Sequence, residues 1–266
     1  MAADLGEIYM LGAFTALLVA GVLGIVGFPA GGILIVAALA AVVWSAAYGY
    51  TLEKVAYKPL RGAPRLSPLI SAIGMSIFLQ NYVLLAQTSD YVPFPRLLPE
   101  MEFLDYLGNI MGPSDFLILV TSTLAMVSLS LFIRYTRMGK AMRATAQNRK
   151  MALLLGINAD RIISLTFIVG SALAALGGVL IASHMGQVNF GIGFLAGLKA
   201  FTAAVLGGIG SIPGAMVGGL VLGIAESMTT GYLSGNYEDA LAFALLILIL
   251  IFRPDGILGK AKVQKV

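Results

Sequence analysis

The stretch Ile8–Leu52, IYMLGAFTALLVAGVLGIVGFPAGGILIVAALAAVVWSAAYGYTL, carries no charged residue. A helix needs ~20 apolar residues to cross the ~30 Å hydrocarbon core of a bilayer, so this run is too long for one span and suits two. The segment Gly27–Gly32, GFPAGG, lies inside the run and is typical of a break between helices. The stretch therefore predicts two membrane-spanning helices joined by a short turn.

The composition of the whole chain supports the same class. Of its 266 residues 59% are hydrophobic and 11% charged, with a mean hydropathy of +0.92. A soluble domain carries about 25% charge, so lipid must be the solvent for most of this chain. The absence of Cys from the sequence excludes disulfides and thiol chemistry. One His and no acidic cluster predict no metal site, and the start of the chain does not resemble a signal peptide.

Further uncharged runs predict a helical bundle of about six to eight membrane segments in one all-α domain, residues 1–266. The third run contains Gln80 and Asn81, which we expect to find partners inside the bundle. The fifth carries Gly170, Ala174 and Gly178 at a spacing of four, which favours close helix packing. The expected third, fourth, fifth and last spans are Leu66–Ser89, Phe116–Ile133, Ile162–Ser183 and Ala240–Phe252.

The segment Phe194–Ser227 is apolar but interrupted by Gly207–Gly214, GGIGSIPG. Each half has about 13 residues, or roughly 20 Å of helix, which predicts a helical hairpin that either re-enters the membrane or makes two short spans. A broken helix at membrane depth lines a cavity or is buried in protein, so a translocation pathway and simple close packing both stay open. The candidate pathway residues are Gly207, Gly208, Gly210, Ser211, Pro213 and Gly214.

Two charged residues flank this hairpin, Lys199 and Glu226. An ionisable side chain inside a membrane segment is a functional candidate by default. Both lie near the expected hairpin ends, where Lys199 can reach the interface and Glu226 can face external water. We group them with Gln80 and Asn81 as the candidate polar residues of the bundle.

Basic residues are concentrated in three stretches, 53–65, 134–161 and 253–266, which hold all Lys and Arg except Arg96 and Lys199. Cytoplasmic loops are rich in Lys and Arg, so this excess indicates membrane orientation rather than nucleic-acid binding. Even numbers of spans separate the stretches, which places all three, and both ends of the chain, on the cytoplasmic side. The acidic, proline-containing segment 90–115 is then external.

The basic loop 134–161 has an apolar pattern of its own. Ala144, Met151, Leu154 and Leu155 recur at helical spacing, and Gly156 fits the end of a helix. Short amphipathic helices here would dock a partner protein, although an ordinary connector at the lipid headgroups is the alternative. The spans lack the charged pairs of proton-driven transporters, and no phosphate-binding Gly-Lys-Ser/Thr motif occurs. The chain is thus not expected to be an enzyme or to hydrolyse ATP itself; a sodium-driven transporter stays open.

Four motifs together resemble the permease of branched-chain amino acid ABC importers, of the "H" type of the Liv system. They are SAIGMSIFLQNY at 71–82, the loop from Arg143-Ala144 to Gly156-Ile157, KAFTAAVLGGIGSIPGA at 199–215 and RPDGILG at 253–259. The resemblance covers nearly the whole chain. It implies a bacterial inner-membrane subunit that works with a second permease subunit, two cytoplasmic ABC ATPases and a periplasmic substrate-binding protein, with ATP bound by the partners and no cofactor of its own.

The resemblance also implies roles for individual residues. The loop 134–161 corresponds to the coupling loop that seats on an ATPase, and the residues matching the family motif are Arg143, Ala144, Ala146, Asn148, Ala152, Gly156 and Ile157. Family members usually begin with another apolar span, which this chain is expected to lack, since Asp4–Met10 aligns only with the end of the following motif. Related cargoes such as urea or short amides are an alternative, and a stand-alone channel or secondary transporter is a second.

Overall fold

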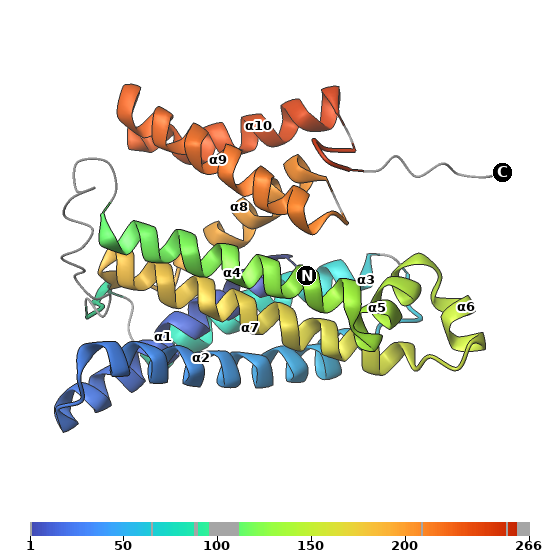
Figure 1. The fold of residues 1–266 in the computed structure, drawn as a ribbon, viewed down its shortest axis with the longest axis horizontal. Coiled ribbons are helices and arrows are strands. Elements are labelled where there is room, and N and C mark those ends of the chain that lie inside the picture. The colour runs from blue at the N-terminus through green and yellow to red at the C-terminus, as the bar shows by residue number, and fades with distance from the viewer. Residues whose placement is uncertain are drawn as a thin grey trace. The chain divides into compact units, whose positions relative to one another are not determined.

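The computed structural model describes residues 2–64, 66–87, 90–95, 112–208, 210–253 and 255–259, and they are almost entirely helical (Figure 1). The acidic segment 96–111 and the basic residues beyond Gly259 lie outside the described residues. The α-helices are α1 (Ala2–Val26), α2 (Ala30–Leu52), α3 (Ser67–Ala86), α4 (Pro113–Tyr135), α5 (Arg137–Gln147), α6 (Arg149–Leu154), α7 (Ala159–Met185), α8 (Ile192–Gly207), α9 (Ile212–Tyr232) and α10 (Glu238–Phe252). A π-helix (Glu53–Tyr57), a 3₁₀ turn (Gly235–Tyr237) and two short strands, β1 (Val92–Pro93) and β2 (Gln187–Val188), complete the fold.

Seven of the described helical segments are long and apolar enough to cross a membrane. They correspond to α1, α2, α3, α4, α7, α9 and α10, and α8 is a shorter apolar helix. The predicted all-α bundle with six to eight membrane segments is therefore confirmed. Gly27, with a φ of +82°, ends the first helix, and Pro29 precedes the second, as the GFPAGG segment indicated.

The first helix differs from the expected span. It begins at Ala2 instead of Ile8, so Asp4 and Glu7 belong to a membrane helix, where they are 1% and 0% exposed. The sequence placed both carboxylates ahead of the uncharged run and gave them no role. The structure corrects this: the first membrane helix carries two buried acidic side chains.

The chain divides into two compact units, residues 3–195 and 196–266. In the first unit, α7 packs closely on α1 and α2 through small residues. A Cβ added to Gly178 would collide with the backbone carbonyl of Tyr9, and one added to Gly12 would lie 2.6 Å from the Cα of Ala175. Gly49 of α2 meets Ser171 in the same way. Close helix contact therefore occurs along α7, but of the predicted stripe only Gly178 takes part in these closest approaches, with Ser171 and Ala175 beside it.

The two ends of the long helices in the first unit differ in character (Figure 1). At one end β1 pairs antiparallel with β2, with Val92 opposite Val188, and His184 Nδ1 lies 3.2 Å from Asp115 Oδ1. At the other end lie α5 and α6. This arrangement puts the loop after α3 and the loop after α7 on one face, and the first two basic stretches on the other, which agrees with the parity of the spans.

In the second unit, α8 and α9 form a hairpin around Gly208–Ser211, and α10 follows. The backbone after α10 returns to the break: Ile257 N–H donates to Leu206 O at 2.9 Å and Leu258 N–H to Gly207 O at 3.0 Å. The end of α8 at the break therefore lies next to residues 257 and 258 of the RPDGILG motif, which follows α10. The interruption is thus a turn between α8, of 16 residues, and α9, of 21 residues.

Candidate functional site: the coupling segment and its anchor

Local capping explains why the loop 134–161 folds into two helices. Thr136 Oγ1 accepts a hydrogen bond from Gly139 N at 3.0 Å and begins α5. Asn148 ends α5 in an extended conformation and its Oδ1 accepts from Lys150 N and Met151 N, both at 3.1 Å, which starts α6. Gly156, with a φ of +78°, ends α6 with the two backbone bonds of a Schellman motif. The predicted stop at Gly156 is confirmed.

The residues that the family motif assigns to coupling have distinct structural positions. Arg143 donates through Nη2 to the carbonyl of Arg134 at 3.3 Å, so it closes the end of α4. Ala152 is 1% exposed and packs inward. The others lie at or near the surface of the segment: Ala144 and Ile157 half-buried, and Ala146, Asn148 and Gly156 exposed. Several of these residues therefore shape the segment, and contact with a partner stays a prediction for all seven.

Exposed apolar side chains follow the exposed Arg149 and Lys150 along α6. Leu154 and Leu155 are 81% and 77% exposed, and Met151 and Leu153 are exposed beside them. The sequence grouped Met151, Leu154 and Leu155 with Ala144 on one face, whereas Ala144 lies on the other helix and is half-buried. The apolar surface thus belongs to α6 and the residue that follows it. We call Met151, Leu153, Leu154 and Leu155 the apolar knob.

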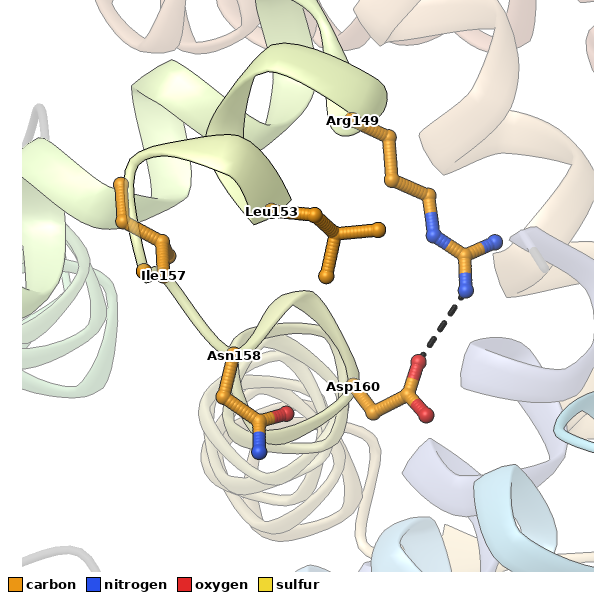
Figure 2. A pocket seen from close by; sticks show the side chains of 6 residues that line it. Arg149, Leu153, Ile157, Asn158 and Asp160 are labelled. Carbon is orange, nitrogen blue, oxygen red and sulfur yellow. Dashed lines mark hydrogen bonds and ion pairs between the residues drawn. The ribbon is translucent and has the colours of Figure 1, made fainter.

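A chain of ion pairs ties α6 to the buried interior of the first unit. Arg149 Nη2 lies 3.1 Å from Asp160 Oδ1, at the start of α7 (Figure 2). The same carboxylate oxygen accepts from Arg61 Nη1, and Arg61 Nη2 donates to Glu53 Oε1 on the π-helix. Ser164 Oγ donates to Glu53 Oε2 at 2.6 Å. We call Arg149, Asp160, Arg61 and Glu53 the anchor network.

The anchor network has an exposed half and a buried half. The side chains of Arg149 and Asp160 are 42% and 48% exposed, that of Arg61 is 13% exposed, and that of Glu53 is 1% exposed. Two cations alternate with two anions, so the network is neutral and each buried charge has a partner, as buried charges require. It starts at the surface of α6 and ends in the core.

The π-helix that carries Glu53 has a second buried link. The Tyr57 hydroxyl donates to Asp4 Oδ2 on α1, and the Tyr57 ring lies 5.1 Å from that of Phe167 on α7, measured between centroids. One five-residue turn therefore contacts α1 and α7 and is linked through Arg61 and Asp160 to α6. π-Helical turns occur frequently at functional sites.

A shallow hollow adjoins the anchor network on the side of α6. It is lined by Arg149, Leu153, Gly156, Ile157, Asn158 and Asp160. Figure 2 shows Leu153 lying between the Arg149–Asp160 pair and Ile157. The hollow thus combines one apolar member of the knob with the exposed ion pair.

The Gly-rich break brings backbones into close contact in the second unit. A Cβ on Gly218 would lie 2.7 Å from Gly207 N, and one on Gly208 would lie 2.5 Å from Gly259 N. Gly208 and Gly210 have φ values of +106° and +96°. Ser211 Oγ accepts from Gly214 N at 3.1 Å, and Pro213 follows in the first turn of α9. Close packing accounts for Gly208 and Gly218, and the positive φ accounts for Gly210. A place in the pathway stays a prediction.

Lys199 and Glu226 are not isolated charges as the sequence suggested. Lys199 Nζ lies 3.3 Å from Glu226 Oε1 and 3.3 Å from Asp239 Oδ1, and it also pairs with Glu238. The ion pairs join α8, α9 and the start of α10 within the second unit. In the structure, these ion pairs hold the three helices together.

The polar residues of α3 also differ from expectation. Gln80 Nε2 and Ser76 Oγ donate to Glu7 Oε1 at 2.8 and 2.9 Å, so Gln80 does find a partner inside the bundle. Asn81 does not: it is exposed, and its Nδ2 donates to the carbonyl of Ile77 one turn earlier at 2.8 Å. A Ser, Thr or amide side chain can satisfy itself on its own helix in this way. Glu7 was missed because its charge stood outside the uncharged run.

Comparison with known proteins identifies the family. A model described as the branched-chain amino acid transport system / permease component matches residues 5–250. The chain belongs to this family. The permease is 51% identical over 265 residues to the high-affinity branched-chain amino acid transport system permease protein LivH of Escherichia coli (strain K12), covering 98% of this chain and 86% of that protein. No solved structure matches it.

Other relatives extend the comparison. The permease is 51% identical over 265 residues to the high-affinity branched-chain amino acid transport system permease protein BraD of Pseudomonas aeruginosa, again over 98% of this chain and 86% of that protein. The autoinducer 2 import system permease protein LsrC of Yersinia enterocolitica is 33% identical over 140 residues, 50% of this chain and 38% of LsrC. The permease is therefore a membrane transport protein of this family.

Proposed function

We propose that the permease is the transmembrane subunit of an ATP-driven importer of branched-chain amino acids, and forms half of the translocation pathway. A second permease subunit forms the other half, two cytoplasmic ABC ATPases drive transport, and a periplasmic binding protein delivers the substrate. The 51% identity to LivH and BraD over 98% of the chain supports the cargo class. The chain itself holds no cofactor in this proposal; ATP is bound by the partners.

The observation that carries the proposal is the apolar knob on α6. Exposed apolar surface on a membrane protein outside its lipid-facing spans is unfavourable in water and typical of a protein–protein contact. The knob occupies the end of the first unit that bears the first two basic stretches, away from the β1–β2 end. A cytoplasmic ATPase approaching this end of the first unit could therefore contact the knob. ATP-driven closure would then push on α6, and the spans would alternate between inward and outward access.

Replacing Leu154 and Leu155 by Asp tests the docking. Both side chains are largely exposed, so the permease should reach the membrane in normal amount, while copurification of the ATPases and leucine uptake should be lost. Tyr91→Asp is the matched control, because Tyr91 is 66% exposed at the β1–β2 end. Normal ATPase copurification with the doubly substituted permease would contradict the proposal.

Two further measurements address energy source and cargo. Uptake by the whole complex should disappear when the phosphate-binding lysines of both ATPases are replaced, since the permease has no nucleotide motif of its own. Uptake that survives would identify a channel or secondary transporter. Competition of labelled leucine with unlabelled isoleucine, valine, urea and acetamide separates the proposed cargo from the amide alternative: only the amino acids should compete.

A further inference from the structure

The anchor network joins an exposed helix to a buried carboxylate through three ion pairs, two of which share Asp160 Oδ1. Its members come from the apex of the coupling segment, the start of α7, the loop after the π-helix and the π-helix itself. Residues 61 and 160 lie far apart in sequence and meet only in the fold. A contact that only stabilised the segment would have no need of a charged path into the core, where each buried ion is costly.

We infer that Arg149 and Asp160 are positioning residues that transmit the displacement of α6 to the π-helix and hence to α1 and α7. The inference rests on the proposed function and deepens it: it names the residues through which an ATPase moves the spans. Arg149 is the input, because it is the member of the network on α6. Asp160 is the branch point, because its one oxygen holds Arg149 and Arg61 together.

The π-helix is suited to receive the movement. Glu53 is held by Arg61 and Ser164, and Tyr57 is held by Asp4 and Phe167, so the turn has charged or hydrogen-bonded contacts on two sides. A shift of Arg61 therefore reaches α7 through Ser164 and α1 through Asp4. Packed interiors respond to such shifts as rigid bodies, since they cannot deform continuously.

The competing role for Arg149 is a direct contact with the ATPase. The two roles predict different effects of substituting Arg149. Transmission requires the Arg149–Asp160 pair, so Arg149→Ala should have no further effect once Asp160→Asn has been introduced. A direct contact would add its effect in both backgrounds. Arg149→Lys should largely restore function in the first case, because a lysine also pairs with Asp160.

The test uses the complete complex, reconstituted in liposomes with its ATPases and loaded binding protein. We expect Arg149→Ala and Asp160→Asn to keep ATPase copurification and basal ATP hydrolysis, and to raise the ATP hydrolysed per leucine imported by about fivefold or more, the lower end of typical coupling between sites. Lys54→Ala is the control: Lys54 lies on the same π-helix, with its Nζ 5.6 Å from the centroid of the Tyr50 ring. Its ratio should equal that of the unmodified complex.

The outcomes separate this inference from the proposed function. If the unmodified complex imports leucine with ATP and all variants keep its ratio of ATP to leucine, the transmission role is overturned while the proposed function stands. Loss of ATPase copurification in Arg149→Ala, or additive effects in the double variant, would assign Arg149 to the ATPase contact and also overturn the inference. An unmodified complex without ATP-dependent uptake would overturn the proposed function itself.

Discussion

Removing Arg61 should destabilise the permease far more than removing Arg149, although both pair with Asp160. Arg61→Met leaves Glu53, whose side chain is 1% exposed, without its cationic partner. Breaking a buried pair by deleting one member costs about 3–5 kcal/mol, because a buried charge is left uncompensated. Ser164 still donates to Glu53 at 2.6 Å, so we expect the lower end of this range.

Arg149→Met breaks only a pair whose side chains are 42% and 48% exposed. Exposed pairs contribute about 0.2–1 kcal/mol, since water screens them and both side chains lose freedom on pairing. At about 2–4 °C per kcal/mol for domains of this size, Arg61→Met should lower the melting midpoint by about 6 °C or more and Arg149→Met by less than about 4 °C. Adding Glu53→Gln to Arg61→Met removes the uncompensated charge and should recover most of the loss.

The assay is thermal unfolding of the detergent-purified permease, followed by the fluorescence of its one tryptophan, Trp44, at a single scan rate. Lys54→Met serves as a control for the loss of a cation from the same region. Equal losses in Arg61→Met and Arg149→Met, or no recovery in the double variant, would refute the view that burial sets the energetics of the anchor network.

Three further predictions concern other parts of the molecule. Gly208→Ala should cost about 1–3 kcal/mol in the same melting assay, because its φ is +106° and the new Cβ would lie 2.5 Å from a backbone nitrogen, whereas Gly24→Ala meets open space and should be neutral or slightly stabilising. Glu7→Ala leaves the buried Ser76 hydroxyl and the half-buried Gln80 amide without their acceptor and should lower stability by about 1–3 kcal/mol, with Glu7→Gln milder, as read from the melting midpoint. In this cysteine-free chain, Ala146→Cys should react with a membrane-impermeant maleimide only in opened cells and Tyr91→Cys in intact ones; the reverse pattern would invert the predicted orientation.

The spans could be predicted because lipid imposes a simple requirement on sequence. Uncharged runs of about 20 residues fix where helices lie, and the helices observed at residues 67–86 and 159–185 match the expected ones within a few residues at each end. The helix stop at Gly156 was predicted from local chemistry. The caps at Thr136 and Asn148 were not predicted, although both are residue types that favour this position. The positions of the spans and of some helix ends can thus be predicted from residues that are close together in the sequence.

The anchor network could not be predicted, because its charges are far apart along the chain. Glu53 lies in a basic stretch and Asp160 lies near the start of a helix. Neighbouring residues therefore accounted for each charge, and neither called for a distant partner. Glu7 was missed for a related reason: hydropathy alone assigns a carboxylate next to an apolar run to the water side. A single sequence carries no signal for such pairings, since they depend on which helix faces lie together. Asn81 shows the opposite error, since a polar residue in a span can be satisfied by its own helix.

The return of residues 257–258 to the end of α8 has a consequence for biogenesis. The carbonyls of Leu206 and Gly207 receive their donors from residues synthesised about 50 positions later, which at about 5–20 residues per second means a delay of several seconds. Throughout this interval the tip of the α8–α9 hairpin has two backbone acceptors that only water or headgroups can satisfy. These two hydrogen bonds at the hairpin tip can therefore form only after α10 and the residues that follow it have been made.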